Sequence, residues 1–278
     1  MPNVTMSDLW NGPIGQPWIE SADRYDGMLS GLGQLALDAA GLQPGESVLD
    51  IGCGSGQLCR QAAARVAPGG RVTGVDIAER LVGLARERAA GTSDTYLVGD
   101  AQDLVLAPAA FDAVISRFGV MFFEDPVAAF TNIARATVPG GRMAVVVWQS
   151  ALVNPWVMTT LQAFAPHLGA PALPPPGAPG PFAFGDEDRV RSVLQAAGWQ
   201  DITITPVETS VLVGGPGTLD EAVAFSTGDG FAKGMLAAGQ EADQKAAVLA
   251  LREAYVASMT PEGLRLGAAV FVVQARRG

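Results

Sequence analysis

The stretch VLDIGCGSG at residues 48–56 has the residue types of a ligand-binding turn. An apolar run leads into glycines at alternate positions, Gly52, Gly54 and Gly56, and a helical pattern begins at Gln57. Glycine permits positive φ and lets a ligand approach the bare backbone, while the start of a helix offers free N–H groups. The pattern predicts a strand, a tight turn and a helix that bind a nucleotide, and two large ligand families use such a turn.

Three carboxylates, and the absence of one glycine that the dinucleotide-binding pattern requires, indicate which of the two ligand families this turn binds. A dinucleotide-binding turn has a third glycine where this chain has Gln57, and it has no use for a fixed negative charge at Asp50, two residues before Gly52. A carboxylate there suits a cation such as an α-ammonium or a sulfonium. Asp76, 24 residues beyond Gly52, ends the second strand and can accept hydrogen bonds from both ribose hydroxyls. Asp100 ends the third strand, where a carboxylate can accept from an adenine amino group.

These residues resemble a known family, the class I S-adenosylmethionine-dependent methyltransferases, in the branch related to ubiquinone and menaquinone biosynthesis and to natural products. The resemblance covers about residues 20–150 and, more loosely, the rest of the chain. Five motifs carry it in the usual order: VLDIGCGSG at 48–56, GVDIAERLVGLAR at 74–86, GDAQDL at 99–104, FDAVISRFGVMFFEDP at 111–126 and VPGGR at 138–142.

The resemblance implies S-adenosylmethionine as the cofactor, S-adenosylhomocysteine as the product and no metal. It places Asp50 and the backbone of the turn near the methionine part of the cofactor, Asp76 on the ribose, and Arg117 with Phe118 beside the sulfonium. The full set of implied cofactor-binding residues is Asp50, Gly52, Cys53, Gly54, Gly56, Gln57, Asp76, Ile77, Asp100, Ala101, Gln102, Arg117 and Phe118.

Methyl transfer from such a cofactor needs an in-line nucleophile, exclusion of water and, for an O–H or N–H acceptor, a base. His167 is the only histidine and the candidate base, because its side-chain pKa lies nearest neutrality; a structural or surface histidine is the competing interpretation. The candidate acceptor site is mainly aromatic, which predicts a small hydrophobic acceptor. Its residues are Trp10, Trp18, Tyr25, Met121, Phe122, Trp148, Trp156, Phe182 and Phe231.

Other functions remain open at this point. A nicotinamide-dependent oxidoreductase is disfavoured by Gln57 and Asp50. A protein of the same fold could bind S-adenosylmethionine without transferring methyl, as a binding module or a non-methylating catalyst, because fold does not settle function. Nucleic-acid methylation is disfavoured by the charge and by SRFG at 116–119, where enzymes acting on base amino groups commonly have an NPPY-like tetrapeptide.

Composition narrows the class further. The chain has 278 residues, of which 49% are hydrophobic, and its net charge of −10 argues against a partner built of phosphates. The two cysteines, Cys53 and Cys59, are too few for a disulfide framework or a zinc site, so we expect a reduced, cytoplasmic setting. Neither a secretion signal nor a membrane span is expected, and a homodimer is an open possibility.

The elements that position these residues alternate between strand and helix, which predicts a doubly wound, Rossmann-like α/β sheet. The resemblance adds seven strands, the last one antiparallel and located at 268–276.

We expect an arm and helix over the cleft at 1–45 and a cofactor-binding core at 46–150. A proline-rich crossing follows at 151–186, and 187–278 completes the sheet. Expected strands are 48–51, 71–75, 95–98, 112–116, 142–148, 201–213 and 268–275; expected helices are 20–40, 57–66, 78–90, 126–137, 155–164 and 187–197, with a helical cap at about 214–265 broken by STGDGFAKG.

Overall fold

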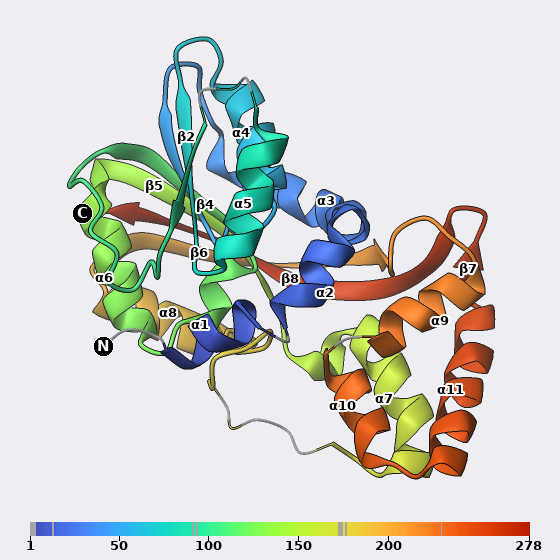
Figure 1. Cartoon of the computed structure of the whole chain (residues 1–278). Helices are drawn as coiled ribbons and strands as arrows, with labels where there is room; N and C mark the ends of the chain where they lie inside the picture. Colours follow the sequence, from blue (N-terminus) through green and yellow to red (C-terminus); the bar gives the residue numbers. More distant parts are fainter. Residues whose placement is uncertain are drawn as a thin grey trace.

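The computed structural model describes residues 4–12, 14–90, 92, 94–171, 175, 177–228 and 230–278. Over these residues the strands lie side by side in the order β3-β2-β1-β4-β5-β8-β6, with the short β7 paired to β8 (Figure 1). Strands β1 to β5 are parallel, and β8 is antiparallel to both of its neighbours. The predicted doubly wound sheet with an antiparallel last strand is therefore confirmed. The strands are β1 Ser47–Ile51, β2 Arg71–Asp76, β3 Thr95–Val98, β4 Phe111–Arg117, β5 Thr137–Trp148, β6 Trp199–Leu212, β7 Met259–Thr260 and β8 Gly263–Arg277.

Helices cover both faces of the sheet because the strands are apolar on both sides. Val48 packs with side chains of α3 (Ala22–Ala40), α4 (Gln57–Val66) and α5 (Glu79–Arg88), whereas its neighbour Leu49 belongs to the larger core that includes α6 (Pro126–Ala136) and α8 (Glu187–Ala196). Successive residues of a strand point to opposite faces, so one apolar run serves two helical layers.

Two helix ends follow the predicted local rules. Helix α3 ends at Gly41, which has a left-handed φ of 55°. Helix α6 begins after Asp125, whose side chain accepts a hydrogen bond from the Ala128 N–H, with Pro126 at its first position. The turn that precedes α6 is thus a helix cap, as the sequence predicts.

The part of the chain before the core is the predicted helical arm, and besides the helix expected at 20–40 it contains two helices whose bounds the sequence did not give, α1 (Val4–Trp10) and α2 (Gly15–Glu20). They lie across the carboxyl edge of the sheet (Figure 1). Asn11, between them, donates through Nδ2 to the Ile77 carbonyl at 3.0 Å and accepts at Oδ1 from the Glu79 N–H at 2.9 Å. These bonds attach the arm to the end of β2 and the start of α5.

A helical unit stands at one end of the sheet (Figure 1). It contains α7 (Pro155–Leu168), α9 (Leu219–Gly228), α10 (Gly230–Ala238) and α11 (Glu241–Val256), which pack on one another. The hydroxyl of the buried Tyr255 joins three of these helices, because it lies 3.0 Å from Thr160 Oγ1 and 2.9 Å from Ser226 Oγ.

The structure corrects several expected boundaries. Helix α7 continues to Leu168 rather than stopping at 164, and β5 begins at Thr137 rather than 142. The expected break in the cap falls within STGDGFAKG but is short: α9 ends at Gly228 and α10 begins at Gly230, whose φ of 61° is left-handed, and residue 229 lies outside the described residues. In the proline-rich crossing, residues 172–174 and 176 also lie outside the described residues.

Candidate cofactor-binding site

The glycine turn has the backbone that its sequence predicts. Gly52, Gly54 and Gly56 all have positive φ, at 69°, 52° and 78°. Gly52 also passes close to Gly119 after β4: a Cβ added to Gly52 would lie 2.5 Å from the Gly119 Cα, a backbone atom that cannot move aside. Side chains at these two positions are therefore excluded by the close approach of the two strand ends.

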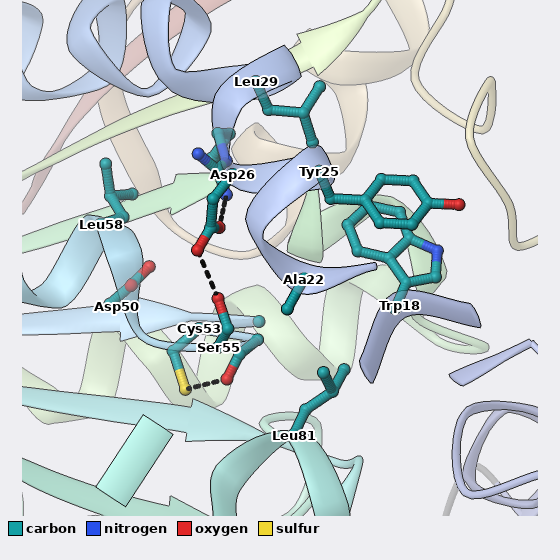
Figure 2. Close-up of a pocket in the computed structure, with 13 residues that line it drawn as sticks. Trp18, Ala22, Tyr25, Asp26, Leu29, Asp50, Cys53, Ser55, Leu58 and Leu81 are labelled. Atoms are coloured by element: carbon teal, nitrogen blue, oxygen red, sulfur yellow. Dashed lines mark hydrogen bonds and ion pairs between the residues drawn. The ribbon is translucent and has the colours of Figure 1, made fainter. Parts of the chain in front are cut away.

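A cavity of about 50 Å³ lies between this turn and α3 (Figure 2). Its wall includes the turn on one side and the stacked rings of Trp18 and Tyr25 on another, whose centroids are 3.9 Å apart. Pockets that hold small ligands measure roughly 300–1,000 Å³. The observed conformation is thus nearly closed. The lining residues are Trp18, Ala22, Tyr25, Asp26, Leu29, Asp50, Gly52, Cys53, Gly54, Ser55, Leu58, Leu81 and Arg117.

Asp50 is the buried acid of this cavity. Only 1% of its surface is exposed, and Oδ2 accepts a hydrogen bond from Cys59 Sγ at 3.1 Å, whereas Oδ1 has no partner among the described residues. Burial raises the pKa of Asp50 to about 7, against the opposing effects of the Cys59 hydrogen bond and the nearby charge of Arg117. An unpartnered buried carboxylate oxygen fits a cationic ligand group, because an unpaired polar atom is costly to bury.

Asp76 and Ile77 lie where β2 ends. The Asp76 carboxylate accepts from the Gly54 N–H at 2.8 Å and from the Ala78 N–H at 2.9 Å, while burial raises its pKa. The Asp76 carboxylate therefore holds the glycine turn in place. Its assignment to ribose stays a prediction.

The turn after β3 supplies the third predicted group. The Asp100 carboxylate accepts from the Gln102 N–H at 2.9 Å, and Gln102 Oε1 in turn accepts from the Asp125 N–H at 2.8 Å. Ala101 is buried, and its carbonyl accepts from Asn132. Since β1, β2 and β3 are parallel neighbours, Asp50, Asp76 and Asp100 stand at one edge of the sheet. The assignment of this turn to adenine is not tested by these contacts.

Arg117 and Phe118 end β4 and point in different directions. The Arg117 guanidinium lines the cavity and donates to Gln57 Oε1 and, at 3.5 Å, to Asp26 Oδ1. Phe118 has a left-handed φ of 67°, and its ring stacks on Trp148 with centroids 4.2 Å apart.

Asp26 is the charged lining residue of the site that the sequence did not single out. It lies on α3 and is 8% exposed. Its carboxylate accepts from Ser55 Oγ at 2.9 Å, from Arg88 at 3.0 Å and from Arg117. The sequence does contain a signal for Asp26, because this acid lies on the apolar face of an amphipathic helix, one turn from the buried Ala22 and Leu29.

The predicted acceptor residues divide into two aromatic groups. The first connects Trp10 to Phe122 and Trp18, and Trp18 to Tyr25, which also contacts Phe225 of α9, an aromatic residue absent from the predicted set. The second connects Phe118 through Trp148 and Trp156 to Phe182. Met121 is buried in the core, and its carbonyl accepts from the Gly180 N–H.

Two predicted residues lie elsewhere. His167 is exposed at the end of α7 and is not among the residues that line the cavity. Phe231 is 39% exposed on α10. The structure does not bring either side chain to the cofactor turn. No described helix is long and apolar enough to cross a membrane, and no metal-ligand cluster of three or more His, Cys, Asp or Glu occurs among the described residues.

Similarity to known proteins agrees with this geometry. A methyltransferase domain family matches residues 49–145. The chain is 31% identical over 190 residues to a 2-phytyl-1,4-naphtoquinone methyltransferase of Thermosynechococcus vestitus, covering 63% of this chain and 81% of that protein. It is 34% identical over 178 residues to nocamycin O-methyltransferase of Saccharothrix syringae, covering 60% and 63%. The chain therefore belongs to the class I S-adenosylmethionine-dependent methyltransferases.

Solved structures share the fold. A geranyl diphosphate C-methyltransferase of Streptomyces coelicolor superposes with a TM-score of 0.51 at 16% identity, covering 90% of this chain and 76% of that chain. The chain spans about half the length of several curated relatives that it matches, among them an uncharacterised Mycobacterium tuberculosis protein with 35% identity over 150 residues and 53% of either chain covered.

Proposed function

We propose that this protein transfers a methyl group from S-adenosylmethionine to an oxygen, nitrogen or carbon atom of a small, mainly hydrophobic molecule. The observation that carries the proposal is the cavity beside the glycine turn, which is lined by both Asp50, whose Oδ1 has no partner among the described residues, and Arg117. A carboxylate and a guanidinium together complement the ammonium and carboxylate of an amino acid, which is the tail of this cofactor.

When bound, S-adenosylmethionine supplies a methyl group already activated on a positive sulfur, so the chain's residues need to bind, orient and exclude water. Asp50 and Arg117 hold the amino-acid end, and Asp76 and the turn after β3 hold the nucleoside end. The aromatic side chains of Trp18 and Tyr25 exclude water and offer an apolar surface to the acceptor, while Trp148 is buried and supports the site from the core. No residue of the described cavity is assigned as a base.

A small aromatic or isoprenoid acceptor fits this surface. The relatives named for nocamycin and for 2-phytyl-1,4-naphtoquinone support a hydrophobic acceptor and favour methyl transfer over binding without transfer. The net charge of −10 supports a substrate other than nucleic acid. Cys53 and Cys59 are both free thiols, which supports a reducing, cytoplasmic setting.

The closed cavity implies that the cofactor enters by moving the residues that cover it. Trp18 belongs to α2 and Tyr25 to the first turn of α3, so the residues that cover the cavity come from the arm and the helix that follows it. We infer that α1 and α2 open as a lid and close again over the cofactor, as loops and terminal segments do in many enzymes.

The test is formation of S-adenosylhomocysteine in the presence of phenols, amines and enols of increasing hydrophobicity. Acceptor-dependent formation of this product, with a matching mass increase of one methylene in the acceptor, supports the proposal. Binding of NADH in place of the sulfur ligands would overturn it. Size measurement by light scattering at the working concentration decides whether the active form is a homodimer.

A further inference from the structure

One carboxylate of α3 collects donors from three separate elements at the rim of the cofactor cavity. Asp26 accepts from Ser55 Oγ of the glycine turn at 2.9 Å, from Arg88 Nη1 of α5 at 3.0 Å and from Arg117 Nη2 at the end of β4 at 3.5 Å. Figure 2 shows Asp26 pointing from α3 toward Ser55, with the hydrogen bond drawn. Asp26 therefore lies between these three elements and can fix their relative positions.

Arg117 depends on this carboxylate. Only 12% of the Arg117 side chain is exposed, and burial lowers the pKa of its guanidinium while the charges of Asp26 and Asp50 oppose that effect. The Gln57 amide oxygen accepts from Nη1. A buried cation without an opposite charge would be strongly disfavoured, so Asp26 stabilises the guanidinium inside the cavity wall.

The cavity therefore has a negative and a positive lining group. Asp50 presents an oxygen without a partner, and Arg117 presents a planar guanidinium. A guanidinium repels a sulfonium and binds a carboxylate through paired N–H donors. Arg117 is thus suited to the carboxylate end of an amino acid rather than to the sulfonium beside which the resemblance placed it, and Asp50 is suited to the ammonium.

We propose that Asp26 is a positioning residue that holds Arg117 beside Asp50, and that this pair makes the site specific for nucleosides carrying an amino-acid zwitterion. The proposal rests on the proposed function and assigns its ligand selectivity to a residue of α3. The ligand class is an adenosine thioether or sulfonium with an α-amino-acid tail. An adenosine thioether lacking the tail would lose both charged contacts.

The experiment compares two ligands by calorimetric titration of the full chain. S-adenosylhomocysteine carries the amino-acid tail, and 5′-methylthioadenosine keeps the nucleoside and the thioether without it. The variants are Asp26→Asn and, as matched control, Asp23→Asn. Asp23 lies on the same helix and pairs with Arg88 at 2.6 Å, but its side chain is 91% exposed and no contact joins it to Arg117 among the described interactions.

We expect the wild type to prefer S-adenosylhomocysteine, and Asp26→Asn to reduce that preference by about tenfold or more, as expected for a charge-assisted hydrogen bond. Affinity for 5′-methylthioadenosine should stay within about twofold in both variants, since the nucleoside contacts are retained. Asp23→Asn should keep the wild-type preference.

Equal losses for both ligands in a folded Asp26→Asn protein would assign Asp26 a structural role and overturn the proposal, as would an unchanged preference. If Asp26→Asn does not fold by circular dichroism, Arg117→Lys is measured instead. This variant keeps the positive charge but loses the paired donors, and the same fall in preference is expected. Wild-type protein that binds neither ligand would instead refute the proposed function itself.

Discussion

Replacing Asp50 with asparagine should make the protein more stable and at the same time weaken cofactor binding. Asp50 is buried in the cavity, its Oδ1 has no partner among the described residues, and burial raises its pKa from 3.8 to about 7. The folded state therefore binds a proton that the unfolded chain releases. Stability due to this group is fully present below about pH 4 and is lost as pH rises through about 7.

The magnitude follows from the shift. A pKa that folding raises by about 3 units means that the folded state destabilises the ionised carboxylate, relative to the unfolded chain, by about 4 kcal/mol at most, at about 1.4 kcal/mol per unit. Asparagine mimics the neutral acid in size and charge. The Asp50→Asn substitution should therefore raise the free energy of unfolding by about 2–3 kcal/mol more at pH 8 than at pH 5, because at pH 5 the wild-type carboxyl is already protonated in the folded state.

Urea unfolding at pH 5 and pH 8 measures this difference, with Asp103→Asn, a change at an exposed carboxylate, as control. The same variant should bind S-adenosylhomocysteine about 10–100-fold more weakly at pH 8, because it loses the partner for the ammonium group. A stability change that is the same at both pH values, or a loss of stability at pH 8, would refute the assignment of Asp50 as a strained acid that cofactor relieves.

Further substitutions test the other parts of the site. Asp76→Ala should weaken cofactor binding by about tenfold or more because it removes the acceptor of the Gly54 N–H, and calorimetry that finds wild-type affinity would contradict this. Gly119→Ala should destabilise the fold by about 1–3 kcal/mol in thermal unfolding, since its Cβ would lie 2.4 Å from the Ile51 carbonyl oxygen; a wild-type melting temperature would disprove the close approach. His167→Ala should keep wild-type turnover, because this side chain is exposed and outside the cavity, and a large loss of turnover at unchanged cofactor affinity would restore its role as base.

Much of the fold could be predicted because local pattern and tertiary packing agree. Helix α4 and strand β3 have the predicted bounds, since a run of β-branched and apolar residues before a glycine and a helical pattern after a glycine turn leave few alternatives. The cap is different. Its glycines predicted a break within residues 226–234 but not its position, since α9 extends to Gly228 and α10 begins at Gly230 with a left-handed φ of 61°. The two helices extend into this glycine-containing segment because α10 packs on α7 and α9 packs on α11, and this packing outweighs the weak local preference of glycine against helix.

The site residues likewise divide into those that a local sequence pattern predicts and those that only the fold brings together. Asp50 and the turn glycines are consecutive in sequence and carry a recognisable pattern, so they could be named directly. Asp26 is separated from Ser55 by 29 positions and from Arg117 by 91, and only the fold brings these side chains together. The arm was expected to be helical, but the bounds of α1 and α2 could not be predicted, because short helices owe their stability to the surface on which they pack.

The most direct test of the central claim is calorimetric titration of the wild-type protein with S-adenosylmethionine at pH 8 and pH 6. We predict micromolar binding at pH 8 that weakens about tenfold at pH 6, since Asp50, with its pKa near 7, must be ionised to receive the ammonium group. Absence of binding at both pH values, or an affinity that does not change between them, would contradict the account of the cavity given above.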